Sequence, residues 1–284
     1  MTPPFRERHL TAQDGLQLYY RDYGDPLSRG TPVLCLTGLT RNSADFADLA
    51  ARLAPHRRVL CPDYRGRGRS AWDPNWRNYD PMVYLGDIRH ILTANDVDRV
   101  IIVGSSLGGI LSMGMAVLFP SSVAAVVIND IGPDIEDEGL GRILDYIGTD
   151  HPQPDWPSAV SALRATLPRL ASKSDDWWQR FARATYREGA DGLLHYDWDV
   201  ALAKPLIRSN GKVQDLWPIF GALRDIPALV VRGALSDVLS ARGLKRMAEA
   251  KPDLLQVTVS DVGHVPSLDE PEIQGILDDF IARY

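Results

Sequence analysis

The segment at residues 100–110, VIIVGSSLGGI, most constrains what this chain can fold into. Its four β-branched residues predict a buried strand, and the small and apolar residues that follow predict a helix. Between them, Ser106 stands at the centre of GSSLG, which fits the G-x-S-x-G pattern of a serine on a sharp strand-to-helix turn. Gly104 and Gly108 lack a Cβ, so strand and helix can approach closely around the serine. The segment therefore predicts a nucleophile elbow with Ser106 at its apex.

The rest of the chain alternates short apolar strand patterns with amphipathic helix patterns. Strands are expected at 5–10, 16–23, 33–37, 58–61, 100–103, 123–128, 228–231 and 255–259. Helices are expected after Ser43, Asp80, Gly109, Ser240 and Glu270. Alternation of this kind predicts an α/β fold with a mostly parallel, eight-stranded sheet and helices on both faces. The first two strands should form an antiparallel hairpin.

Residues 132–223 interrupt the alternation. The interval shows helical patterns and no convincing strand, and it holds five of the seven tryptophans, Trp156, Trp177, Trp178, Trp198 and Trp217. We expect a helical cap, inserted between two strands and lying over the carboxyl ends of the sheet. Residues 1–131 and 224–284 would then form the core domain. Some cap aromatics should face the substrate, because ligand pockets are mostly apolar.

A catalytic serine needs a general base, and His264 is the strongest candidate. It lies in the loop that follows the last strand pattern and precedes the last helix. That position is at the carboxyl edge of the sheet, where the strand before Ser106 also ends. The other five histidines fall on the hairpin, on a helix, before a strand or in the cap.

The base in turn needs a carboxylate that orients it. Asp237 follows the strand pattern at 228–231 and should reach the same edge as His264. The chain order Ser106, Asp237, His264 fits the order in which this kind of triad occurs. Asp130 follows the strand pattern at 123–128 directly and is the alternative acid. Its other interpretation is a turn residue at the entrance to the cap.

Acyl transfer also requires donors for the developing oxyanion. One should be the backbone N–H of Leu107, which follows the nucleophile. The second should come from the loop after the strand pattern at 33–37, and we nominate the N–H of Leu39, next to the flexible Gly38.

Composition excludes several classes of protein. The formal net charge of -6 and the pI near 5.5 argue against nucleic acid as a partner and favour a small, neutral or weakly polar substrate. The N-terminus has no apolar leader, and no apolar run is long enough to span a membrane. Cys35 and Cys61 lie in apolar strand patterns, which predicts free buried thiols and a cytoplasmic location.

Taken together, these motifs resemble the α/β-hydrolase superfamily, in particular its capped esterase, lactonase and C–C hydrolase-like branch. The resemblance covers nearly the whole chain and includes the loop DYRGRGRS at 63–70, similar to the family's D-x-x-G-x-G-x-S. It implies that Arg65, Arg67 and Arg69 belong to a structural loop rather than a phosphate site. Thr37 stands where the family usually has His.

The leading hypothesis is a serine hydrolase that cleaves a carboxylic ester or lactone through an acyl-enzyme. The resemblance also leaves open a C–C bond hydrolase of a dienoic or diketone-like acid with the same triad, and a non-catalytic ligand receptor. Family members that open epoxides or displace halide carry Asp at the elbow, and Ser106 argues against both activities. The sequence contains no metal-binding or dinucleotide motif, so we expect no metal and no cofactor.

Overall fold

A computed structural model describes residues 5–170, 173–208 and 215–284 of the chain. They form an eight-stranded sheet in the order β1-β2-β4-β3-β5-β6-β9-β10 and a separate two-stranded sheet, β7-β8. The pairs β1–β2 and β2–β4 are antiparallel, and the remaining pairs of the large sheet are parallel. The expected mostly parallel, eight-stranded α/β sheet is therefore confirmed, with its antiparallel hairpin at one edge.

The strands are β1 (Arg6–Thr11), β2 (Gln17–Tyr23), β3 (Val33–Leu36), β4 (Val59–Asp63), β5 (Val100–Ser105), β6 (Val123–Asn129), β7 (Tyr186–Glu188), β8 (Leu194–Tyr196), β9 (Ala228–Gly233) and β10 (Leu255–Val259). The helices are α1 (Ala47–Leu53), α2 (Pro81–Ala94), α3 (Leu107–Leu118), α4 (Asp137–Ile147), α5 (Trp156–Thr166), α6 (Asp175–Arg183), α7 (Ala203–Arg208), α8 (Trp217–Gly221), α9 (Ala241–Ala250) and α10 (Pro271–Ala282).

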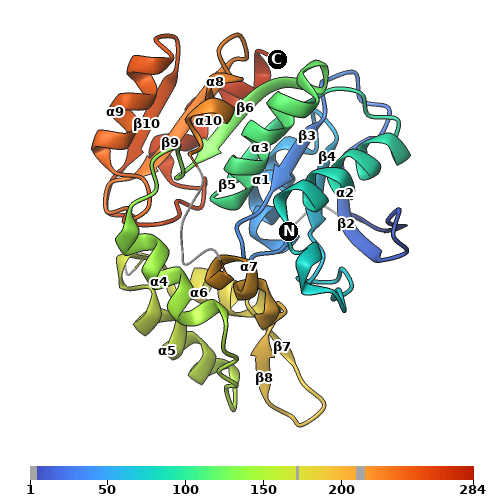
Figure 1. The fold of residues 1–284 in the computed structure, drawn as a ribbon, viewed down its shortest axis with the longest axis vertical. Helices are drawn as coiled ribbons and strands as arrows, with labels where there is room; N and C mark the ends of the chain where they lie inside the picture. Colours follow the sequence, from blue (N-terminus) through green and yellow to red (C-terminus); the bar gives the residue numbers. More distant parts are fainter. Residues whose placement is uncertain (1–4, 171–172, 209–214) are drawn as a thin grey trace.

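The centre of the sheet explains why its strands lack an alternating pattern. Every residue of β3 and β6 is buried, as is every residue of β5 except Ser105. Helices lie on both faces, with α2 and α3 in front and α1 and α10 behind (Figure 1). Strands covered on both sides read as continuous apolar runs, and their burial is the main source of stability.

Residues 132–223, here called the insert, join β6 to β9. Most of the insert forms a smaller body below the sheet, made of α4 to α7 and the hairpin β7–β8 (Figure 1). The hairpin was missed because each strand is only three residues long. The last helix of the insert, α8, returns to the larger body and packs against α3.

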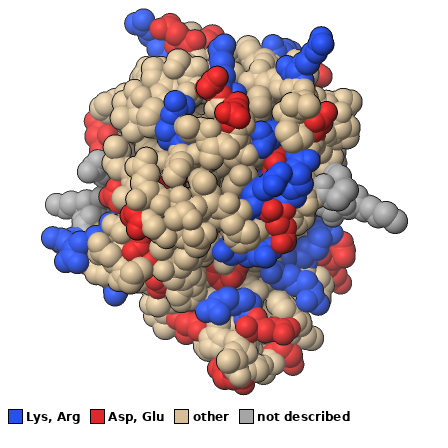
Figure 2. All heavy atoms as spheres, turned by 90° about the vertical axis from the view of Figure 1, so that its right-hand side faces the viewer, with Lys and Arg blue, Asp and Glu red and all other residues tan. Residues whose placement is uncertain are grey.

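Charged side chains of both signs are interspersed over the face of the molecule drawn in Figure 2. Figure 2 shows basic side chains gathered on part of one face, toward the junction of the larger and smaller bodies. Within the described part of the chain, no helix combines the length and the apolar character needed to cross a membrane.

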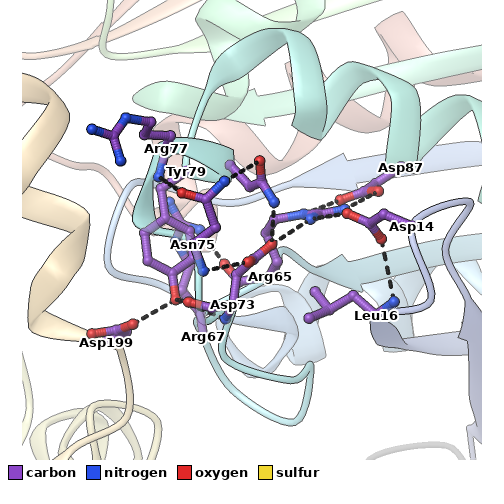
Figure 3. A network of polar contacts seen from close by, with 11 residues as sticks. Asp14, Leu16, Arg65, Arg67, Asp73, Asn75, Arg77, Tyr79, Asp87 and Asp199 are labelled. Atoms are coloured by element: carbon purple, nitrogen blue, oxygen red, sulfur yellow. Dashed lines mark hydrogen bonds and ion pairs between the residues drawn. The ribbon is translucent and has the colours of Figure 1, made fainter.

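A buried arginine anchors the long loop that follows β4. The side chain of Arg65 is 1% exposed and bonds three carboxylates, those of Asp14, Asp73 and Asp87 (Figure 3). Asp14 comes from the turn between β1 and β2, and Asp87 lies on α2, so one guanidinium joins three segments. Burial raises the pKa of Asp87, whereas the hydrogen bond from Arg65 lowers that of Asp14.

We predict that Arg65→Met lowers the free energy of unfolding by about 3–5 kcal/mol, because it leaves buried carboxylates without their counter-ion. Urea denaturation followed by circular dichroism measures the change. Arg224→Met is the control, since Arg224 pairs with Asp225 in an ion pair whose side chains are 82% and 81% exposed. Equal urea midpoints for the two variants would contradict the anchoring role.

The insert meets the core at a carboxylate with a perturbed pKa. Asp197, directly after β8, accepts a hydrogen bond of 2.9 Å from Asn42 Nδ2 of the core. Burial, together with the negative charge of Asp63, raises the pKa of Asp197 to about 6. An unfolded aspartate titrates near 3.9, roughly two units lower. The folded state therefore holds this proton more tightly, and stability falls as the pH rises from about 4 to about 6.

Asp197→Asn removes this titration while keeping an acceptor for Asn42. We predict that the variant melts at a higher temperature than the wild type at pH 8 and at nearly the same temperature at pH 4. Differential scanning calorimetry at the two pH values is the measurement. The exposed Asp225→Asn is the control and should shift neither value. A variant with no gain at pH 8 would show that Asp197 is not strained by its burial.

Candidate active site

Ser106 occupies the turn between β5 and α3. Its backbone has φ 51 and ψ −115, in the left-handed region that costs a residue with a side chain free energy. The two glycines make this turn possible, as an added Cβ at Gly108 would lie 2.0 Å from the Leu36 carbonyl oxygen, and one at Gly104 would lie 2.3 Å from that of Gly108. The local prediction of a sharp strand-to-helix turn is therefore met in the geometry.

Three polar side chains form a continuous hydrogen-bonded chain at this turn. Ser106 Oγ lies 3.0 Å from His264 Nε2, and His264 Nδ1 lies 2.8 Å from Asp130 Oδ2. With the proton on Nδ1, the ring donates to Asp130 and accepts from the serine hydroxyl. His264 is 7% exposed and Asp130 is fully buried, so both contacts are shielded from water.

Asp130 is held in place by the end of β9 and by the loop that follows it. Besides the contact with His264, it accepts hydrogen bonds from the backbone N–H of Gly233 at 2.8 Å and from Ser236 Oγ at 2.6 Å. The residue itself has φ 58, which turns the chain sharply after β6. The carboxylate is thus fixed by two donors other than the histidine, as an orienting group requires.

Asp237, our first choice for the acid, bonds arginines instead of His264, and this corrects the expectation. Its carboxylate forms two bonds with Arg142, at 2.7 and 3.0 Å, and one of 2.5 Å with Arg169. Burial alone would raise the pKa of Asp237, but these two arginines outweigh it and lower the pKa. Both arginines belong to the insert, so Asp237 turns toward the insert and leaves His264 Nδ1 to Asp130.

The two nominated backbone donors lie next to Ser106. Leu107 is the first residue of α3 and follows the serine directly. Gly38 places the other loop beside it, since a Cβ on Gly38 would be 3.7 Å from that of Ser106. Among the described residues, neither the N–H of Leu39 nor that of Leu107 donates a hydrogen bond to a protein acceptor. Neither N–H is therefore used in holding the described part of the fold together.

Two cavities lie near this turn: one is lined by Ser105 and Pro266, which neighbour the elbow and the His264 loop, and the other by His264 itself. The first, here called the Trp177 cavity, has a volume of about 400 Å³, and its lining includes Gly38, Arg41, Ser105, Trp177, Phe181 and Pro266. The second, the Arg142 cavity, has a volume of about 310 Å³, and its lining includes Glu138, Arg142, Leu167, Arg169, Asp237 and His264. The insert contributes to both, whereas Trp178 is fully buried in the packing of the insert.

Several residues of the site carry no local sequence signal. Asn129 Nδ2 donates to Ser105 Oγ and to the Pro266 carbonyl, both at 2.8 Å, and so links the elbow to the His264 loop. The arginines of the Arg142 cavity were also missed, because only the folded insert brings them to the sheet edge. Within the described ranges, no group of three His, Cys, Asp or Glu side chains is arranged to hold a metal ion.

Residues 31–271 match the family described as the alpha/beta hydrolase fold. The chain belongs to the α/β-hydrolase family. It is therefore a hydrolase, and the resemblance seen in its motifs is confirmed. The match extends from just before β3 into the start of α10, so it includes the elbow, the insert and the His264 loop.

Individual relatives of this hydrolase act on different compounds. The chain is 32% identical to a 3-hydroxybutyrate-oligomer hydrolase of Cupriavidus necator, over 90% of this chain and 89% of the relative. It is 31% identical to a 2-(acetamidomethylene)succinate hydrolase of Mesorhizobium japonicum, over 86% and 85%. A crystal structure of an α/β hydrolase from Novosphingobium aromaticivorans superposes with a TM-score of 0.93 at 39% identity and covers both chains completely.

The geometry makes opposite predictions for the two acids. Asp130→Asn should lower kcat by roughly 10⁴-fold, because the amide favours the wrong imidazole tautomer. Asp237→Asn should lower kcat by less than about tenfold, since this group contacts arginines and not the histidine. Steady-state kinetics on one ester, with circular dichroism to confirm folding, compares the two variants. A dead Asp237→Asn beside an active Asp130→Asn would reverse the assignment.

Proposed function

We propose that the protein is a serine hydrolase that cleaves carboxylic esters through an acyl-enzyme. The observation that carries the proposal is the continuous chain Ser106, His264 and Asp130 beside two unpaired backbone donors. A nucleophile, a base with an oriented tautomer and an oxyanion site are the parts that acyl transfer requires. We assign these roles to Ser106, His264, Asp130 and the N–H groups of Leu39 and Leu107.

The proposed reaction has two halves. Ser106 Oγ attacks the ester carbonyl carbon while His264 Nε2 takes the hydroxyl proton, and the carbonyl oxygen becomes an anion bound by the two N–H groups. Collapse breaks the bond to the alkoxy group, which leaves as an alcohol with the proton from His264. Water then attacks the acyl-enzyme, with His264 again as base, and releases the acid and free Ser106.

The arginines that share a cavity with His264 support a proposal for the substrate class. Arg142 binds Asp237 through Nε and NH2, and its NH1 has no acceptor among the residues that the structure describes. The two relatives are named for the compounds that they hydrolyse, a 3-hydroxybutyrate oligomer and a substituted succinate. Both compounds are carboxylic acids. We therefore propose an ester that carries a free carboxylate, such as a short hydroxy-acid oligomer, in place of the neutral substrate expected from composition.

In this proposal, residues 132–223 act as the cap, and Trp177 and Phe181 contact the acyl or alkoxy chain.

C–C bond hydrolysis is the second candidate, because the chain is 31% identical over 207 residues to a 2-hydroxy-6-oxo-2,4-heptadienoate hydrolase of Pseudomonas putida.

Cys35 and Cys61 are free and buried, which suits the cytoplasmic location expected from the sequence.

The first experiment tests the chemistry. Wild-type protein should react with a fluorophosphonate probe and hydrolyse 3-acyloxybutanoates, whereas Ser106→Ala should do neither while remaining folded. The expected loss of kcat is about 10⁴-fold or more. Turnover of a vinylogous 1,5-diketone acid without turnover of esters would instead favour the C–C hydrolase. A folded wild type that neither reacts with the probe nor hydrolyses any ester would contradict the proposed function.

The second experiment tests the carboxylate. We predict that kcat/KM is at least tenfold higher for a 3-acyloxybutanoate than for its methyl ester. Arg142→Met should lower kcat/KM for the free acid by about 10–100-fold, as expected for loss of a charge-assisted hydrogen bond, and leave the methyl ester within about threefold. Arg242→Met is the control, because Arg242 lies on the surface with 81% of its side chain exposed. Equal losses for both substrates would contradict carboxylate recognition.

A further inference from the structure

The loop that carries the proposed oxyanion donor is held from both sides by buried side chains. Tyr64 donates its hydroxyl to the Thr37 carbonyl at 3.2 Å, and Arg67 donates its Nε to the Leu39 carbonyl. The peptide between these two carbonyls carries the N–H of Leu39. Because the neighbouring peptide planes are fixed at their oxygens, the N–H between them has little freedom to turn. Oxyanion donors are effective when they are oriented before the reaction begins.

Arg67 is unusual because its positive charge is buried without an acid. The side chain is 0% exposed, and the guanidinium also donates to the Arg65 carbonyl at 2.8 Å and to the Tyr84 hydroxyl at 3.3 Å. It lies 5.1 Å and 4.9 Å from the ring centroids of Tyr64 and Tyr84. Across the described ranges, no carboxylate forms an ion pair with it, whereas its neighbour Arg65 has three.

A buried, unpaired charge is costly, and neutral oxygens and aromatic faces offset only part of the cost. The cost is recovered if a negative charge forms nearby during the reaction. In the proposed mechanism the oxyanion forms at the N–H of Leu39, and the carbonyl of the same residue accepts a hydrogen bond from Arg67. In a water-excluded site, attraction between the guanidinium and that oxyanion is stronger than in solution.

The same residue also connects this loop to the insert. The backbone of Arg67 forms an isolated antiparallel bridge with Trp198, and Figure 3 shows Arg67 beside the Arg65 network, with Asp199 of the insert bonded to Tyr79. Backbone bonds of 3.0 Å from Gly68 N to the Asp197 carbonyl and of 2.8 Å from Asp199 N to the Gly66 carbonyl flank the bridge. The backbone of Arg67 is therefore bonded to the insert, whereas its side chain is bonded to the Leu39 loop of the core.

We propose that Arg67 is a positioning residue that orients the Leu39 N–H and places a positive charge behind the oxyanion site. The proposal rests on the proposed function, because it presumes that an oxyanion forms at Leu39. It assigns Arg67 no contact with the substrate. It also leaves phosphate binding by the three arginines of this loop without support, since Arg65 and Arg67 are buried and already bonded.

The test compares Arg67→Met, which removes the charge and the donors, with Arg67→Lys, which keeps a charge. Arg67→Met should lower kcat by about 10–100-fold, a fraction of the loss seen when an oxyanion donor is removed, with KM within about threefold. Arg67→Lys should recover a large part of kcat. A boronic acid that adds to Ser106 places an oxygen in the oxyanion site, so its inhibition constant should rise by the same factor as kcat falls.

Arg69→Met is the matched control, because Arg69 lies on the same loop with a 51% exposed side chain and pairs with Glu7. It should keep wild-type kcat and boronic acid affinity. A folded Arg67→Met with kcat within about threefold of the wild type would overturn the proposal, as would a loss of kcat with unchanged boronic acid affinity.

If Arg67→Met does not fold, Tyr64→Phe tests the other side of the loop. It removes one hydroxyl from a buried ring and should lower kcat by about fivefold or more, again with weaker boronic acid binding. Wild-type kinetics for a folded Tyr64→Phe would overturn the proposal. The outcomes separate the two levels of inference: an inactive wild type defeats the proposed function and this proposal together, whereas an active wild type with active variants defeats this proposal alone.

Discussion

The close approach of three backbone segments at Ser106 is the constraint on which the rest of the site depends. Gly108 of α3 touches the end of β3, and Gly104 of β5 touches Gly108, so strand, helix and neighbouring strand leave no room for a Cβ. The serine backbone is held in a costly conformation because the sheet on both sides is buried and rigid. The Ser106 hydroxyl is thereby fixed at the edge of the sheet. It contacts His264 there, and His264 in turn contacts Asp130.

The elbow and the eight-stranded sheet could be predicted because their signals are local. Glycine spacing, β-branched runs and capping residues act within a few positions of the elements they define. The choice between Asp130 and Asp237 could not be made in this way. Both follow strands and reach the same edge, and what separates them is Arg142 and Arg169, about 95 and 68 positions away in the chain from Asp237. Contacts between the insert and the core depend on the folded path of the insert, which residue patterns alone do not reveal.

What a charged side chain does at the site depends on its burial and its partners, and the number of charges matters less. Arg65 forms ion pairs with three carboxylates and fixes a loop, and Asp237 forms ion pairs with two arginines that line a cavity. Arg67 is buried and has only neutral partners among the described residues. Identical side chains therefore differ in what they offer a substrate. An arginine that is fully paired contributes mainly to stability. An arginine with free N–H donors or without a counter-ion can still attract another anion. The net negative charge of the chain says little about these local fields.

The bridge between Arg67 and Trp198 has a consequence for the divergence and engineering of this chain. The insert resembles a replaceable module in sequence position, since it enters and leaves the core at neighbouring strands. Its backbone, however, completes a hydrogen-bonded seam with the loop at 63–70, which belongs to the core. A chimaera that takes its insert from a relative would inherit a mismatched seam unless that loop were exchanged as well. The unit of exchange is thus discontinuous: the insert together with a stretch of the core that precedes it by more than sixty residues.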